Sequence, residues 1–354
     1  MIQTSKVLIS EKAINDVVNV LRSGKISQGE KVREFERAFA DYIGVKHAVA
    51  VNSGTTALLS ILSAFCVKPG DEVIVPAYTF FATVEAVMLL GAKPVFADLN
   101  PEDLTICPKS IEKVITPSTK AIIPVHIFGG ACDMDAINAI AEKHNLYVVE
   151  DCAQAHGTTY KTQTVGSFGI ANAFSFYATK HITTIEGGMV TTNSQTVADY
   201  IRKYRSHGMT DYNTHSILGQ NCRMNEVGAV IGSNQLLTAD SDIRKRQNNV
   251  QRIMENTKID YFVRDIFNHS FFTLPAKVAN PDEFTQLLKE NGIECRRRYL
   301  KPLYEQPVYR NRYGVAHLKV ADFNVYKIVG LPCHQHLSED EIGHIIETVN
   351  KYVA

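Results

Sequence analysis

Short apolar runs alternate with amphipathic helical segments through the first half of this chain, and this alternation constrains the fold more than any other feature. The runs predict strands at residues 48–51, 72–75, 94–97, 121–125, 146–150, 171–176 and 188–192. Periodicity predicts helices at residues 11–24, 30–43, 57–65, 82–90, 108–115 and 134–144. Short apolar strands separated by helices indicate an α/β fold with a mainly parallel, seven-stranded sheet covered on both faces. The last two strands are close in sequence, and we expect them at an antiparallel edge.

The pattern changes near residue 240. Helices are expected at residues 223–238, 241–255, 281–291 and 338–352, and strands at 271–274 and 294–295. Ser338 and Glu341 have the spacing of a capping box for the last helix. We therefore predict a large domain over residues 1–240 and a small α+β domain over residues 241–354.

Charge and cysteine content narrow the class of protein. Lys and Arg number 37, as do Asp and Glu, so no charge bias favours nucleic acid or an anionic membrane as a partner. The 7 cysteines include no Cys-x-x-Cys pair, which favours reduced thiols and a cytoplasmic location. The N-terminal residues lack signal-peptide features, and no apolar run approaches the ~20 residues that cross a bilayer. The Cys333-His-Gln-His336 run has no second ligand cluster, so we expect no metal.

Two loops at predicted strand ends suit a flat, phosphorylated ligand. Ser53-Gly54-Thr55-Thr56 joins a strand to a helix, and the free amides of a helix start bind phosphate. A capped helix without a ligand is the alternative for this turn. Phe80 follows the next strand, where an aromatic ring can stack on a planar cofactor or pack on its own helix.

An acid and a lysine at later strand ends suit the chemistry of the same kind of ligand. Asp151 follows the apolar strand at residues 146–150, and a carboxylate is costly to bury there without a cation such as a pyridinium N–H. A helix cap is the alternative for Asp151. Gln154 can reach the phenolic oxygen of the same ring. Lys180 follows Ser175 by five residues, and a lysine of lowered pKa forms a Schiff base. Together these residues predict a site for pyridoxal 5'-phosphate, whose protonated ring accepts electrons.

These motifs resemble those of the DegT/DnrJ/EryC1/StrS aminotransferases, pyridoxal-phosphate enzymes of fold type I that act mostly on nucleotide-linked keto sugars. The matching stretches are residues 28–36, 50–58, 76–80, 125–129, 150–157, 174–188, 205–209, 221–224 and 331–334. They cover the first two thirds of the chain densely and the last third thinly. The resemblance implies the fold-type-I architecture, with a large cofactor-binding domain and a small C-terminal domain.

The resemblance also assigns roles to individual residues. The residues it places against the cofactor are Thr55, Thr56, Phe80, Asp151, Gln154, Ser175, Lys180 and Asn221. Lys180 is the catalytic Schiff-base lysine, Asp151 the partner of the ring nitrogen and Gln154 the partner of the ring oxygen. Phe80 is the stacking aromatic, and the two threonines and Ser175 bind the phosphate.

Asn221 matches an asparagine that reaches the phosphate from the neighbouring subunit, so the resemblance implies a homodimer with shared active sites. Two departures from the family pattern concern the substrate pocket. Ile185 stands where many members have glycine, and Cys222 stands where an aromatic residue is usual. The basic run at residues 296–298 has two interpretations: a solvated helix end or interface, and a contact for the diphosphate of a substrate.

The expected reaction is a two-stage transamination, with L-glutamate as the amino donor and a keto-sugar nucleotide as the acceptor. Lys180 is placed to move the proton as general acid and base. One alternative is a related dehydratase in which a histidine replaces the lysine, but Lys180 occupies the motif position and His181 only adjoins it. The other alternative is a non-catalytic, cofactor-binding regulatory protein, although the sequence has no evident DNA-binding segment.

Overall fold

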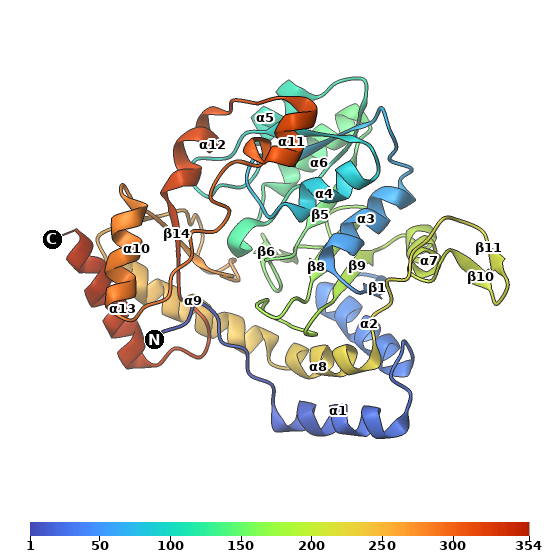
Figure 1. The fold of residues 1–354 in the computed structure, drawn as a ribbon, viewed down its shortest axis with the longest axis horizontal. Helices are drawn as coiled ribbons and strands as arrows, with labels where there is room; N and C mark the ends of the chain where they lie inside the picture. The colour runs from blue at the N-terminus through green and yellow to red at the C-terminus, as the bar shows by residue number, and fades with distance from the viewer. Residues whose placement is uncertain (354) are drawn as a thin grey trace.

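A seven-stranded, mostly parallel sheet dominates the fold of residues 1–353, the part of the chain that the computed structural model describes (Figure 1). The strand order is β1–β9–β8–β5–β4–β2–β3. The strands are β1 (His47–Val51), β2 (Glu72–Pro76), β3 (Lys93–Ala97), β4 (Thr119–Ile122), β5 (Tyr147–Asp151), β8 (Ala171–Ser175) and β9 (Gly188–Thr192). The predicted α/β class is confirmed, and all seven predicted strands are present.

The two strands expected at an antiparallel edge do pair antiparallel, but neither lies at the edge of the sheet. β9 is antiparallel to both of its neighbours and lies inside the sheet, between β8 and β1. β8 is parallel to β5, and β1 forms the edge. All five residues of β9 are buried, so its backbone amides and carbonyls need partners on both sides. An interior position supplies those partners.

Helices cover both faces of the sheet, as the alternating pattern predicts. They are α2 (Glu30–Ile43), α3 (Gly54–Ala64), α4 (Ala82–Leu89), α5 (Pro108–Val114), α6 (Met134–His144), α7 (Gln195–Tyr204) and α8 (Glu226–Leu236), and α1 (Glu11–Ser23) packs on α8. α3 starts earlier than predicted because the Ser53 hydroxyl accepts a hydrogen bond from the Thr56 amide at 3.1 Å. α8 starts later because Asn225 caps the Gly228 amide at 2.8 Å. Caps therefore set both boundaries.

A second, three-stranded antiparallel sheet follows, made of β12 (Asp260–Tyr261), β13 (Leu274–Lys277) and β14 (Ile328–Leu331). Helices α9 (Ala239–Glu255), α10 (Pro281–Glu290) and α13 (Glu339–Tyr352) accompany it. The strand expected at 271–274 begins only at its last residue, because the left-handed φ of 52° at Phe271 interrupts the extended backbone. The strand expected at 294–295 is absent, and only an isolated bridge joins Arg296 to Gly330.

The chain then returns to the large sheet. Helices α11 (Pro307–Tyr313) and α12 (Lys319–Asn324) lie near α5, away from α10 and α13 (Figure 1). Tyr304 and Tyr309 pack edge-on against Phe96 of β3, with ring centroids 5.6 and 4.8 Å apart. The C-terminal part of the chain therefore contributes to both cores, and the domain division at residue 240 stays a prediction.

Two short hairpins complete the fold: β6 (Thr159–Tyr160) with β7 (Gln163–Thr164), and β10 (Met209–Asp211) with β11 (Thr214–His215). The second hairpin projects from the body of the molecule (Figure 1). Within residues 1–353, none of the helices combines the length and apolar character that a bilayer crossing needs.

Candidate active site

A cavity of about 510 Å³ lies where β2, β5 and β8 end and α3 begins. Ligands of open α/β sheets bind at this edge, outside the carboxyl ends of the strands. Six of the predicted site residues line the cavity: Thr55, Phe80, Asp151, Gln154, Ser175 and Lys180. The fold therefore brings together residues from four separate segments of the sequence.

The start of α3 forms one wall and packs closely on the end of β8. A Cβ added to Gly54 would lie 2.8 Å from the Cβ of Ser175, so only glycine permits this approach. The free amides of the first helical turn and the hydroxyls of Thr55 and Ser175 make a cradle suited to a phosphate group. Thr56 is not among the lining residues, and its hydroxyl lies 2.9 Å from that of Ser53. Its contacts are those of a helix cap.

Asp151 is a buried carboxylate at the end of β5. The Thr83 hydroxyl donates to its Oδ2 at 2.8 Å, and the Ala153 amide donates to its Oδ1 at 3.1 Å. Burial raises the pKa of this carboxyl, and the two hydrogen bonds and Lys180 act in the opposite direction. Asp151 forms no ion pair with any residue in 1–353. A cation brought by a ligand would supply the missing partner.

Lys180 lies in the same cavity, on the loop between β8 and β9. Burial lowers the pKa of its amine to about 8, the nearby Arg298 acts in the same direction, and Asp151 opposes them. Its Nζ lies 4.5 Å from the centroid of the Phe272 ring. A substantial fraction of such an amine is neutral near pH 8, and the neutral form is the nucleophile.

Gln154 and Phe80 complete the walls. The Gln154 carbonyl accepts a hydrogen bond from the Phe128 amide at 2.9 Å, and its amide donates to the Tyr299 hydroxyl at 3.2 Å. Phe80 lines the cavity with 59% of its surface exposed, an exposure typical of a ring that covers a ligand. Its centroid lies 5.9 Å from that of Tyr299.

Asn221 does not line the cavity of its own chain. It is exposed, and an isolated bridge joins it to Ser206 after the projecting hairpin. In a single chain Asn221 therefore lies outside the cavity, and a contact with a cofactor phosphate would need a second subunit.

Several residues that shape the cavity carried no local signal in the sequence. Thr83 comes from α4, and Phe272, Arg298 and Tyr299 come from the last third of the chain. The basic run at residues 296–298 is visible in the sequence, but only the folded chain shows that Arg296 and Arg298 line the cavity and that Arg297 does not.

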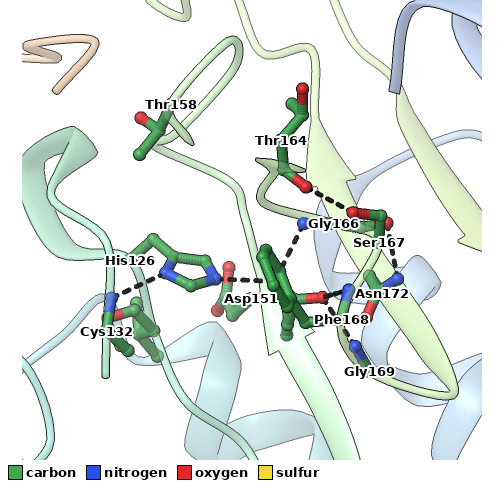
Figure 2. A network of polar contacts seen from close by, with 12 residues as sticks. His126, Cys132, Asp151, Thr158, Thr164, Gly166, Ser167, Phe168, Gly169 and Asn172 are labelled. Atoms are coloured by element: carbon green, nitrogen blue, oxygen red, sulfur yellow. Dashed lines mark hydrogen bonds and ion pairs between the residues drawn. The ribbon is translucent and has the colours of Figure 1, made fainter. Parts of the chain in front are cut away.

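A second polar network includes Glu150, the residue of β5 that precedes Asp151. Figure 2 shows His126 between Cys132 and the strand that carries Asp151. The Cys132 amide donates to His126 Nδ1 at 3.1 Å, so the ring proton is on Nε2, which donates to Glu150 at 3.0 Å. Glu150 also accepts hydrogen bonds from the amides of Gly166, Phe168 and Gly169 at 2.7–2.8 Å.

This network explains a grouping that resembles a metal site. His126, Glu150 and Cys152 place ligand-type atoms within 4.8 Å of one another. Both nitrogens of His126 are already engaged, and both oxygens of Glu150 hold the loop at residues 166–169. The geometry is that of a structural anchor for the end of β5, which fixes the backbone of Asp151.

The family model described as the DegT/DnrJ/EryC1/StrS aminotransferase family matches residues 7–350. The chain belongs to this family. The spore coat polysaccharide biosynthesis protein SpsC of Bacillus subtilis is 39% identical, over 98% of this chain and 95% of its own. The GDP-perosamine synthase of Caulobacter vibrioides is 38% identical, over 92% and 91%. Among solved structures, DesV of S. venezuelae superposes with a TM-score of 0.92 at 31% identity, over 96% of this chain and 94% of its own.

The resemblance inferred from the motifs is therefore confirmed, and the protein is a pyridoxal-phosphate-dependent aminotransferase of this family. The residues present fit the cofactor. The Gly54 cradle accepts a phosphate, and the buried Asp151 carboxylate lacks the cation that a protonated ring nitrogen would supply. An aromatic ring, that of Phe80, and a lysine of lowered pKa, Lys180, line the same cavity.

Proposed function

We propose that this aminotransferase moves an amino group from L-glutamate to a nucleotide-linked keto sugar. Family membership and the similarity to a GDP-perosamine synthase support a sugar nucleotide as the acceptor. The observation that carries the proposal is that Lys180 and Asp151 line one cavity, each with a pKa displaced by burial. Glutamate is proposed as the donor because the resemblance to the family implies it.

We propose that Asp151 holds the ring nitrogen, Gln154 holds the ring oxygen, and the cradle of Thr55 and Ser175 holds the phosphate. Thr56 supports this cradle through its contact with Ser53. When bound, pyridoxal phosphate supplies an aldehyde that captures amines and a ring that accepts electrons. The contribution of Phe80 is to cover one face of that ring and to exclude water from it.

Lys180 serves two purposes in this proposal. Its neutral amine holds the cofactor between turnovers. Once displaced by the incoming amine, it carries a proton between the reacting carbon of the substrate and that of the cofactor. An amine with a pKa of about 8 can take up and release a proton near neutral pH, which an ordinary lysine does poorly.

We propose a homodimer in which Asn221 completes the partner's phosphate cradle. The exposed position of Asn221 next to the projecting β10–β11 hairpin supports this arrangement. Two large apolar residues of the same segment, Tyr212 and Leu218, are 93% and 94% exposed in the single chain. Contact with a second copy would remove them from water.

A cytoplasmic location is proposed on the state of the thiols. All seven cysteines are free, and four of them are buried. Free thiols in this number persist in a reducing compartment.

The experiment is a panel of keto-sugar nucleotides incubated with the purified protein and nitrogen-labelled L-glutamate. We expect label in one amino-sugar nucleotide by mass spectrometry, and none with the Lys180→Ala protein. If only free keto sugars or simple keto acids accept the label, the acceptor is wrong and the aminotransferase assignment stands. If another amino acid supplies the label and glutamate does not, the donor is wrong.

A further inference from the structure

Three consecutive arginines, Arg296, Arg297 and Arg298, lie between β13 and β14, and they differ sharply in their surroundings. Arg296 also lines the cavity, but it pairs with Glu294 at 3.0 Å. Arg297 pairs with Asp282 at the start of α10 and is not among the residues that line the cavity. Arg298 lines the cavity and forms no ion pair with any residue in 1–353. One cation of the three is therefore left without a carboxylate.

The guanidinium of Arg298 is held in place although it has no carboxylate. Its Cζ lies 4.4 Å from the centroid of the Phe272 ring. Its backbone carbonyl accepts a hydrogen bond from the buried Tyr78 hydroxyl at 2.7 Å. Neighbouring side chains of an extended strand point in opposite directions. The left-handed φ of 53° at Tyr299 breaks this alternation, and Arg298 and Tyr299 both line the cavity.

The Nε of Arg298 is buried and has no hydrogen-bond partner in the described chain. A buried donor on a charged group is costly to leave unpaired. Burial also lowers the pKa of this guanidinium, and no carboxylate is among the groups that affect it. These observations describe an arginine positioned for an anion that the protein itself does not provide.

The position of Arg298 indicates which kind of anion binds to it. Arg298 and Lys180 contact the same Phe272 ring, at 4.4 and 4.5 Å from its centroid. The cofactor phosphate belongs at the Gly54 cradle, which Arg298 does not form. The diphosphate of a sugar nucleotide is attached to the anomeric carbon, which is not the carbon that reacts. A carboxylate of an amino acid is attached to the reacting carbon itself or to its short side chain.

We propose that Arg298 binds a carboxylate of the amino donor, and of the keto acid formed from it, and so holds the donor's reacting carbon near Lys180 in the first half-reaction. This inference rests on the proposed function, in which the donor is an amino acid. The planar fork of arginine pairs with a carboxylate through two charge-assisted hydrogen bonds, so the orphan Nε gains a partner. The aromatic contact with Phe272 holds the guanidinium in the same cavity as Lys180, where the amino group reacts.

The test separates the two half-reactions of the holoenzyme. With Arg298→Gln, KM for L-glutamate in the donor half-reaction should rise by on the order of 10²-fold, because a charge-assisted bidentate contact is lost. The acceptor half-reaction, started from the aminated enzyme and a keto-sugar nucleotide, should stay within about threefold of wild type. Arg298→Lys keeps the charge but not the fork and should give an intermediate KM. Arg297→Gln is the matched control, since Arg297 pairs with Asp282 outside the cavity.

Equilibrium binding supplies a readout that does not depend on turnover. Calorimetry with 2-oxoglutarate should show a dissociation constant raised by a similar factor in Arg298→Gln, and an unchanged one in Arg297→Gln. If Arg298→Gln instead weakens the sugar nucleotide and leaves glutamate untouched, Arg298 serves the diphosphate and the inference is overturned. If the wild-type holoenzyme reacts with no amino acid at all, the proposed function itself fails. Should Arg298→Gln not fold, the Arg298→Lys protein decides, because equal glutamate KM in Lys and Arg forms would also overturn the inference.

Discussion

Replacing Asp151 by asparagine removes one buried negative charge at nearly constant shape. The carboxylate accepts hydrogen bonds from the Thr83 hydroxyl at 2.8 Å and from the Ala153 amide at 3.1 Å. The asparagine oxygen can keep the bond to Ala153, and the Thr83 hydroxyl can rotate to accept from the new amide. We therefore expect the free energy of unfolding to change by no more than about 1 kcal/mol.

Catalysis should suffer far more than stability. A preorganised charge that faces the reacting system in a buried site contributes about 3–4 kcal/mol at the transition state. Its loss lowers the rate by roughly 10²–10³-fold. The assay is stopped-flow absorbance of the donor half-reaction under single-turnover conditions, with cofactor content measured for each protein.

Thr83→Val is the matched control, because it removes one neutral hydrogen bond and leaves the charge. Its rate should fall by about tenfold at most. A fully loaded Asp151→Asn protein that reacts within tenfold of wild type would refute the role assigned to Asp151.

Three further predictions follow from the structure. The rate at which the protein freed of cofactor captures pyridoxal phosphate should rise as the pH passes through about 8, the pKa of Lys180, because only the neutral amine reacts; a flat profile between pH 7 and 9 would contradict the lowered pKa. Ile185→Gly should stabilise the protein by up to about 1 kcal/mol in urea unfolding, because a β-branched residue with φ of 71° is strained and 57% exposed; a clear loss of stability would show that Ile185 makes contacts in the dimer. Mixing inactive Lys180→Ala with inactive Asn221→Ala should restore part of the activity through hybrid dimers, and a fully active monomer in sedimentation would rule out shared sites.

Much of the site could be predicted because its reactive residues lie in local motifs at strand ends. Asp151 and Ser175 end strands whose apolar pattern is plain, Lys180 lies in the loop after the second of these strands, and the parallel pairing of the two strands places their ends at one edge. The resemblance to the family then fixed the cofactor, and the comparisons confirm it.

The remaining walls of the cavity depend on contacts across long stretches of sequence. Thr83 meets Asp151 across 68 residues, and Tyr299 meets Gln154 across 145. The periodicity of a sequence does not indicate which distant residues come into contact. The different surroundings of the three arginines are equally tertiary, since contacts such as that of Arg298 with Phe272 form only in the folded chain.

The errors in the predicted elements have local causes of the same kind. The strand expected at 271–274 has the right composition, but left-handed backbone at Phe271 delays its start to Leu274. β9 was placed at an edge because hydrophobicity predicts strands and not their order. Its burial on both faces and its two ladders become visible only in the sheet.

Borohydride reduction of the yellow holoenzyme, followed by peptide mapping by mass spectrometry, tests the central claim most directly. Reduction makes the link between lysine and cofactor permanent, so the modified peptide identifies the residue that holds pyridoxal phosphate. We predict a single modified peptide, with the added mass on Lys180, and no modification in the Lys180→Ala protein. Modification of a different lysine, or a fully loaded protein in which no lysine is modified, would contradict the account.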